Sequence, residues 1–168
     1  MGSQGRVFRR MGEKVRYKAR FLALTCLLQA LLLIMALLMP YLGYCVEINL
    51  SAIKQIESSG NPFAYNERSG AIGLYQITPI CLKEWNTFAK GGCQYTIFDL
   101  ADPAVNSKIA HWYLNNRIPQ MLEYYRKPVT IRNILISYNA GISYVVENKK
   151  LPRETRNYLK KYNRLTIE

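Results

Sequence analysis

The fold is predicted most directly by residues 48–62, which read INLSAIKQIESSGNP. Apolar residues recur there at three- and four-residue spacing, which indicates one buried face of a helix over residues 47–58. The residues of that face are Ile48, Ala52, Ile53 and Ile56. Gly60, Asn61 and Pro62 follow at once, and this combination predicts the end of the helix.

Glu57 lies at the end of this predicted helix, beside apolar side chains. Burial beside apolar groups raises the pKa of a carboxyl group, and a carboxyl with a raised pKa can act as a general acid. Most helix glutamates are simply solvated, so Glu57 by itself is only a candidate. Its role depends on the sequence that follows.

The rest of residues 46–168 predicts further helices, each with its own start or stop signal. Thr78-Pro79 and Asp102-Pro103 each pair an N-cap residue with a proline at the first helical position. Thr130 caps another helix, which Gly141 closes. The expected helices are 79–88, 103–117, 120–126 (after the break at Pro119), 131–139, 142–147 and 152–164. Only residues 94–98 suggest a strand, so the expected fold class is all-α.

The N-terminal 45 residues differ in composition from the rest. Residues 1–20 carry seven bases and one acid, and residues 21–39 carry no charge. An apolar run of this length after a basic leader predicts a membrane span or signal anchor over 21–45, with the N-terminus cytoplasmic. Residues 46–168 would then lie on the periplasmic side of the inner (cytoplasmic) membrane. Cleavage near Cys45, with secretion, is the alternative.

The formal net charge of +12 is shared equally between the leader and residues 46–168. A basic domain on the far side of a membrane suggests an anionic partner such as a cell-wall polymer. Nucleic acid is not expected, because no basic repeat with interleaved aromatic residues and no helix-turn-helix pattern occurs.

Cysteine and histidine usage predicts neither a metal site nor a cofactor. The chain has one histidine, His111, and no C-x-x-C pair. Cys81 and Cys93 are twelve residues apart in the domain, and outside the cytoplasm they could form a disulfide. The alternative is two reduced thiols.

Separated stretches of the domain resemble, in order and spacing, the soluble lytic transglycosylases, whose fold is similar to goose-type lysozyme. The main stretches are Glu57–Pro62, Gly70–Ile77, Ser137–Gly141 and Leu151–Tyr158, and Asp102–Asn106 with Trp112–Leu114 resembles the family's middle helix. The resemblance covers about residues 47–165 and implies a lysozyme-like helical domain. Two residues depart from the family pattern: Tyr75 replaces the usual methionine and Ser137 the usual alanine.

The resemblance also implies an activity on peptidoglycan glycan strands. Glu57 would protonate the bond between N-acetylmuramic acid (MurNAc) and N-acetylglucosamine (GlcNAc). It would then accept a proton from the muramoyl C6 hydroxyl, whose attack closes a 1,6-anhydro ring. The residues expected to contact or shape the substrate site are Ser58, Gly73, Tyr75, Gln76, Tyr138 and Asn139, and Tyr158 is expected to orient Glu57.

No second acid has a setting like that of Glu57. Glu67 is in a loop beside Arg68, and Glu154 is expected to be a helix-start residue favoured by the helix dipole. Glycosidases usually need two carboxylates, but an N-acetyl group on the substrate can replace the second.

Two alternatives stay open. One is a goose-type-like muramidase that uses water in place of the C6 hydroxyl. The other is a membrane-tethered peptidoglycan-binding component of a secretion, conjugation or virion-entry apparatus.

Overall fold

The computed structural model describes residues 24–25, 27–35, 46–89 and 91–167. The chain divides into two compact units, Met1–Cys45 and Val46–Glu168, and each is described by itself. In the first unit the described residues are helical with exposed side chains. The basic leader, part of the predicted span over residues 21–39, and Cys45 lie outside the described residues. Among the residues that are described, no helix is both long and apolar enough to cross a bilayer.

The second unit begins with helix α2, Leu50–Ser58. The Asn49 side chain accepts a hydrogen bond from the Ala52 amide at 3.0 Å, so the helix starts three residues later than predicted. Ala52 and Ile53 are buried as the spacing indicated. The chain leaves the helix through Ser59 and Gly60, both with positive φ, which turns it away from the helix axis.

The predicted capping signals are confirmed at three later helices. Thr78 caps α3 (Pro79–Phe88), Asp102 caps α4 (Pro103–Trp112) and Thr130 caps α6 (Ile131–Ala140). In each case the side-chain oxygen accepts a hydrogen bond from an amide in the first turn. The two remaining helices of the C-terminal part are α7 (Ser143–Val146) and α8 (Arg153–Thr166).

Pro119 changes the helix type without interrupting the chain's helical course. After α4 the backbone continues as a π-helical turn, Tyr113–Arg117, and then as α5, Ile118–Tyr124. The Ile118 amide bonds to the Tyr113 carbonyl, five residues back. Because proline has no N–H to donate, the wider π turn accommodates it in the first turn of α5.

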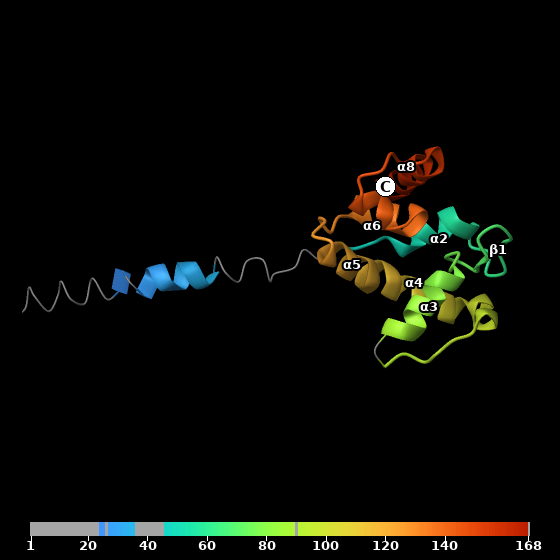
Figure 1. Cartoon of the computed structure of the whole chain (residues 1–168), viewed down its shortest axis with the longest axis horizontal. Helices are drawn as coiled ribbons and strands as arrows, with labels where there is room; N and C mark the ends of the chain where they lie inside the picture. Colours follow the sequence, from blue (N-terminus) through green and yellow to red (C-terminus); the bar gives the residue numbers. More distant parts are fainter. Residues whose placement is uncertain (1–23, 26, 36–45, 90, 168) are drawn as a thin grey trace, which may run out of the picture. The chain divides into compact units, whose positions relative to one another are not determined.

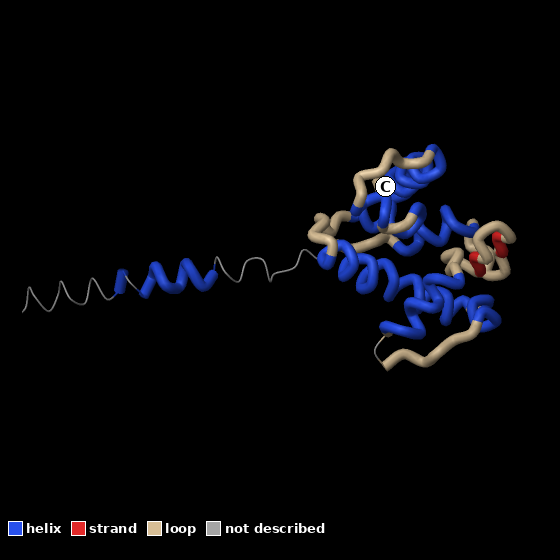
Figure 2. The backbone as a smooth tube through the Cα atoms, in the orientation of Figure 1, coloured by secondary structure: helices blue, strands red, loops and turns tan. Residues whose placement is uncertain are grey.

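The described part of the domain has one small hairpin, which sequence patterns did not indicate. Strands β1 (Tyr65–Asn66) and β2 (Ala71–Ile72) pair antiparallel, and they are the red segments of Figure 2. The predicted strand at 94–98 is wrong, since Ile97–Ala101 is a 3₁₀ helix. The Asp99 carboxylate accepts hydrogen bonds from the Thr96 amide and hydroxyl, which turns the chain into that helix.

The predicted Cys81–Cys93 disulfide is wrong, because both thiols are free. Cys81 is buried in the first turn of α3, whereas Cys93 is exposed in the following loop. The loop is instead attached to α3 by a hydrogen bond from the Trp85 indole N–H to the Cys93 carbonyl, at 2.9 Å.

A single hydrophobic core joins the helices of Val46–Glu168. Ile53 of α2, Leu114, Ile118 and Leu122 of the α4–α5 region, and Ile134 of α6 are almost wholly excluded from solvent. Helix α8 packs against α2 and α6 (Figure 1), which brings the C-terminal helix beside the first helix of the domain. The all-α prediction is therefore confirmed for the described domain.

Candidate functional site

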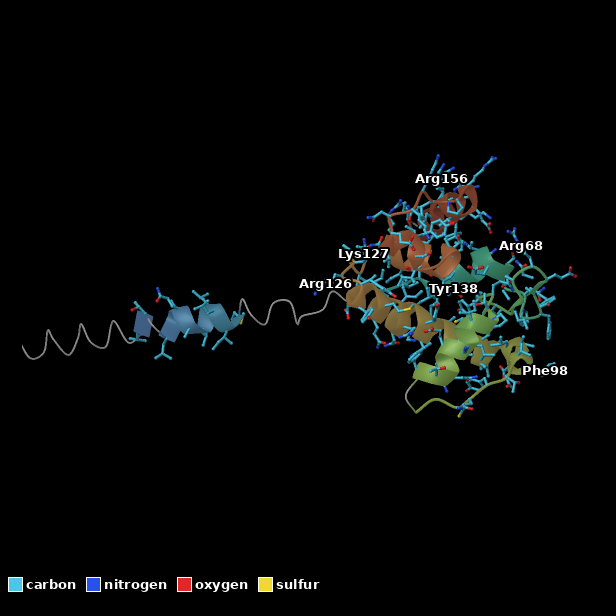
Figure 3. All side chains as sticks on the ribbon, viewed as in Figure 1. Arg68, Phe98, Arg126, Lys127, Tyr138 and Arg156 are labelled. Carbon is cyan, nitrogen blue, oxygen red and sulfur yellow. The ribbon has the colours of Figure 1, made fainter. Side chains whose placement is uncertain are left out.

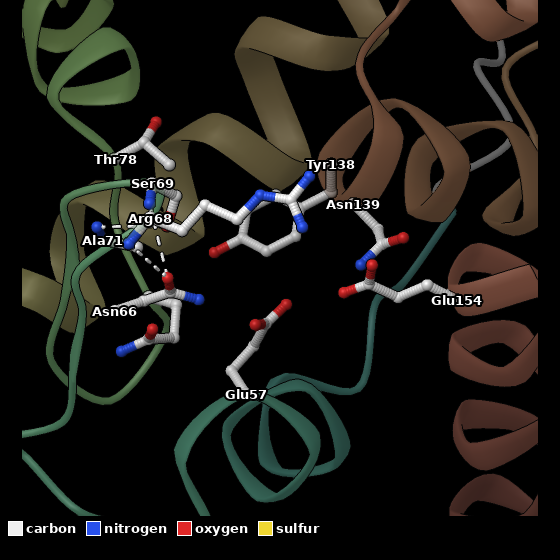
Figure 4. A pocket seen from close by; sticks show the side chains of 10 residues that line it. Glu57, Asn66, Arg68, Ser69, Ala71, Thr78, Tyr138, Asn139 and Glu154 are labelled. Atoms are coloured by element: carbon white, nitrogen blue, oxygen red, sulfur yellow. Dashed lines mark hydrogen bonds between the residues drawn. The ribbon is translucent and has the colours of Figure 1, made fainter. Parts of the chain in front are cut away.

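A pocket of about 370 Å³ lies at the end of α2. It is bounded by the β1–β2 hairpin, the end of α6 and the start of α8, as the close-up in Figure 4 shows. Its lining is largely polar. The lining residues are Glu57, Asn66, Arg68, Ser69, Ala71, Gln76, Thr78, Tyr138, Asn139 and Glu154.

Glu57 projects into this pocket from the last turn of α2. Its pKa is raised to about 7, chiefly because burial removes the carboxylate from water. Repulsion from Glu154 adds to the rise, and the nearby Tyr158 hydroxyl opposes it. Glu57 is therefore an acid that keeps a proton near neutral pH.

Tyr158 lies on α8 with its side chain buried. Its hydroxyl has no hydrogen-bond partner of normal geometry, yet it is close enough to attract the Glu57 carboxylate and lower the pKa of Glu57. Burial and the neighbouring Glu57 charge raise the pKa of Tyr158, so its hydroxyl stays protonated and can donate. This placement suits an orienting role toward Glu57.

Gln76 enters the pocket from a loop that is closed by two backbone hydrogen bonds between Ile72 and Ile77. Gln76 has a φ of 49°. Its side-chain N–H₂ group donates to the carbonyls of Ala64 and Gly73 at 3.1 and 3.2 Å. Both bonds use the amide nitrogen, which leaves the amide oxygen to accept a hydrogen bond from a ligand.

Gly73 supports this loop and does not line the pocket. Its φ is 83°, and a Cβ atom there would be 2.3 Å from Asn106 Nδ2 and 2.6 Å from the Leu100 carbonyl oxygen. Asn106 is fully buried on α4, and its side chain bonds the backbone of Ile72, Tyr75 and Leu100. Only glycine allows the loop to approach this asparagine so closely.

Tyr75 and Tyr138 are joined across the base of the pocket. The Tyr138 hydroxyl on α6 donates to the Tyr75 carbonyl at 2.5 Å. The Tyr75 side chain is only 6% exposed and belongs to the hydrophobic core. Burial, together with the nearby Glu57 charge, raises the pKa of Tyr138 well above its usual value. Tyr138 lines the pocket, whereas Tyr75 supports it from behind.

Ser58 also lies outside the pocket lining. Its hydroxyl donates to the Leu74 carbonyl at 2.8 Å, which ties the end of α2 to the loop that carries Gln76. Of the residues predicted from sequence to act at the site, four line the pocket: Glu57, Gln76, Tyr138 and Asn139. The other four pack around it or hold its backbone: Ser58, Gly73, Tyr75 and Tyr158.

Sequence patterns missed several pocket residues. Glu154 is a first-turn residue of α8, as predicted, but it also lines the pocket and acts on Glu57. The spacing of Glu154 and Tyr158, four residues apart on α8, was a usable signal that both lie near one face. No sequence pattern indicated that Arg68 and Asn66 lie near Glu57, because only the folding of the hairpin brings them to the pocket. In the described part of the chain, no cluster of His, Cys, Asp and Glu could hold a metal ion.

Comparison with known proteins identifies a family and a similar solved structure. The family model "Transglycosylase SLT domain" matches residues 45–160. The chain is similar to the crystal structure of the 70 kDa soluble lytic transglycosylase SLT70 of Escherichia coli. The two share 26% sequence identity, and the TM-score is 0.47. That match covers 70% of this chain and only 17% of SLT70. No curated protein matches the chain.

Proposed function

This chain belongs to the transglycosylase SLT domain family, and we propose that it cleaves peptidoglycan glycan strands without water. The bond cleaved is the β-1,4 bond from MurNAc to GlcNAc, and the product is a 1,6-anhydro-muramoyl end. The observation that carries the proposal is Glu57, a partly buried carboxyl with a pKa of about 7 inside a polar pocket.

Glu57 would act first as the acid. At neutral pH a large fraction of its carboxyl groups are protonated, so the proton is available to the glycosidic oxygen as the bond to the anomeric carbon breaks. The GlcNAc end leaves as an alcohol, and positive charge develops on the muramoyl ring. The substrate's own N-acetyl oxygen stabilises that charge.

Glu57 would act next as the base. Its carboxylate accepts the proton of the muramoyl C6 hydroxyl while the C6 oxygen bonds to the anomeric carbon. The ring closes, the carboxyl regains its proton, and no other reactant is consumed. A group that both gives and takes a proton works best when its pKa lies near the working pH, which favours Glu57 for both steps.

The neighbours of Glu57 have roles that follow from their positions. Tyr158 orients the carboxylate from the buried side. Gln76 and Asn139 offer amide groups to the hydroxyl and N-acetyl groups of the sugars. Tyr138 presents a half-buried aromatic ring, fixed by its bond to Tyr75, against which a sugar ring can rest.

Hydrolysis is a second candidate, and one observation favours it. Glu154 lines the same pocket as Glu57 and is exposed to solvent, so a water molecule could be activated between the two carboxylates. The acid would be the same and only the product would differ.

Product analysis separates these candidates. Purified full-length protein is incubated with intact sacculi, and the released fragments are analysed by mass spectrometry. Non-hydrolytic cleavage gives anhydro-muramoyl ends, which are lighter by one water than reducing ends. Reducing muramic ends as the main product would overturn the proposal and establish the hydrolase.

A matched pair of variants tests whether the chain is an enzyme or only a binding component. Glu57→Gln should release no fragments and still bind sacculi. Glu123→Gln removes an exposed carboxylate that does not line the pocket and should leave cleavage intact. If Glu57→Gln supports the same biological function as the parent, the binding-component alternative is correct.

We also propose that residues 21–39 anchor the chain in the inner membrane, with residues 46–168 in the periplasm. The uncharged run and the basic leader support this arrangement. A periplasmic wall-cleaving domain would suit a secretion, conjugation or virion-entry apparatus. Membrane fractionation combined with protease treatment of spheroplasts tests the topology: the domain should be digested only when the outer membrane is removed.

A further inference from the structure

Arg68 is the one cationic residue among those lining the pocket. Its side chain extends from the β1–β2 hairpin across the pocket in Figure 4, in the direction of Tyr138. Glu57 and Glu154, which approach from α2 and α8, are the two acids of the same lining. The pocket therefore has one positive group on its hairpin side.

The hairpin holds the Arg68 backbone in a defined place. Asn66 pairs with Ala71 across the two strands, and the Gly70 amide donates to the Asn66 carbonyl at 2.8 Å. The Asn66 side chain accepts hydrogen bonds from the amides of Arg68 and Ser69 at 3.1 and 3.3 Å. Such a turn is stiff, so the base of the Arg68 side chain has little freedom.

Arg68 does not pair with the acids of the pocket. The two ion pairs in the described residues are Arg117–Glu84 and Lys149–Glu147. The groups that act on Glu57 are Tyr158 and Glu154, and both effects leave its pKa high. An arginine in contact with Glu57 would lower that pKa, because an opposite charge favours the ionised carboxyl. The Arg68 charge is thus available to a ligand.

A muramoyl substrate brings an anion to this pocket. In a stem-free strand the lactyl group of MurNAc ends in a free carboxylate, and in a stem-bearing strand the peptide carries carboxylates instead. The Glu154 carboxylate, and Glu57 whenever it is ionised, would repel such a group unless a cation offset them. The planar guanidinium of arginine matches a carboxylate with two parallel hydrogen bonds.

We propose that Arg68 binds a carboxylate of the muramoyl unit and so distinguishes acidic muramoyl strands from neutral sugar chains. This inference rests on the proposed function, because it assumes a muramoyl substrate. It adds a specificity residue contributed by the hairpin, with a carboxylate as the ligand class.

The test is a binding cycle in full-length protein carrying Glu57→Gln, so that no cleavage intervenes. Titration calorimetry uses a tetrasaccharide of alternating GlcNAc and MurNAc with free lactyl carboxylates, and the same tetrasaccharide with these groups converted to methylamides. We expect the acid form to bind about tenfold more tightly than the amide form. Adding Arg68→Met should remove that difference, and Arg68→Lys should restore part of it.

Arg132→Met is the matched control, since Arg132 is an exposed arginine outside the pocket lining. It should keep the full preference for the acid form. A stem-bearing tetrasaccharide, in which the lactyl carboxyl is already an amide, identifies the source of the anion. If Arg68→Met weakens its binding too, stem carboxylates are ligands; if it weakens only the stem-free acid form, the lactyl group is the ligand.

The inference is overturned if the Glu57→Gln protein binds the acid and amide forms equally or binds neither form. It is also overturned if adding Arg68→Met leaves the preference for the acid form unchanged. These outcomes are separate from failure of the proposed function. If the proposed function fails, the protein with Glu57 intact releases no anhydro products from sacculi, whatever the result of the binding cycle.

Discussion

Two neighbours act on the pKa of Glu57 in opposite directions. Burial raises the pKa, the nearby Tyr158 hydroxyl lowers it, and Glu154 raises it by charge repulsion. The acid and base steps proposed here need a carboxyl that is neither fully protonated nor fully ionised at working pH. The balance of these two neighbours would therefore tune the proposed reaction.

We expect Glu154→Gln and Tyr158→Phe to shift the pH dependence of cleavage in opposite directions. In kcat/KM, the alkaline limb of the parent should lie near pH 7, where Glu57 loses its proton. Without the Glu154 charge the limb moves to lower pH, and without the Tyr158 hydroxyl it moves to higher pH. Rates of fragment release at a series of pH values measure both shifts, and Glu123→Gln should show neither. Two shifts in the same direction would contradict this account of Glu57.

Glu57 also links the stability of the domain to pH. Its pKa of about 7 lies above the unfolded value of 4.5, so the folded state binds more protons between these values and stability falls as pH rises through them. Glu57→Gln removes this loss. The variant should be more stable than the parent at pH 8, by up to about 3 kcal/mol. Denaturant unfolding of both proteins at pH 4 and pH 8 measures the difference, which should vanish at pH 4.

At the scale of elements, the site depends on how one loop is held. The loop from Ile72 to Ile77 carries Gln76 and passes directly over Asn106 of α4. Asn106 is buried, and its side chain is satisfied by three backbone groups. A buried amide with all its bonds made fixes the loop more strongly than apolar contacts do, because losing one partner leaves a desolvated polar group.

Gly73→Ala and Gly60→Ala form a matched pair that tests this fit. Both glycines have a φ of 83°, but a Cβ meets nothing within 4 Å at Gly60 and meets Asn106 at 2.3 Å at Gly73. Backbone strain alone should cost about 1 kcal/mol at Gly60. Gly73→Ala adds the steric overlap and should cost at least about 2 kcal/mol more. Chemical denaturation measures both values, and equal losses would show that the contact with Asn106 does not matter.

At the scale of the whole molecule, charge is unevenly distributed along the domain. Residues 46–125 carry six bases and seven acids, whereas residues 126–168 carry ten bases and three acids. Four cations of the second group recur at three- and four-residue spacing on α8, opposite the buried face of that helix: Arg153, Arg156, Lys160 and Arg164. Arg156 points outward from α8 in Figure 3. This asymmetry suits attraction to an anionic wall polymer.

Binding to sacculi should therefore weaken with salt. For the full chain carrying Glu57→Gln, we expect about a tenfold loss of binding between about 50 and 500 mM NaCl. The added salt shortens the Debye length and screens the attraction between exposed charges. Replacing Lys160 and Arg164 with glutamine should reduce this dependence, while the same change at Lys54 and Lys83 should have little effect. Pelleting assays measure the bound fraction. Binding that is independent of salt would exclude an electrostatic contribution.

The sequence by itself determined most of the helices, and it singled out Glu57 as the candidate acid. Caps at Thr78, Asp102 and Thr130 are local signals, because a side chain two or three residues away supplies the bond, and so they could be predicted. The strand at 94–98 and the disulfide could not be predicted correctly, because each depends on the packing environment of its residues. The membrane span over residues 21–39 stays a prediction.

Only the tertiary structure decided which residues share the pocket. Glu154 and Arg68 share a pocket with Glu57 because α8 packs on α2 and because a short hairpin turns back over the site. Ser58 and Tyr75, expected to contact the substrate, lie outside the pocket lining and hold the backbone around the pocket. Local spacing fixes which face of a helix a side chain occupies, but the distance between two helices depends on the packing of the whole core, which no short stretch of sequence specifies.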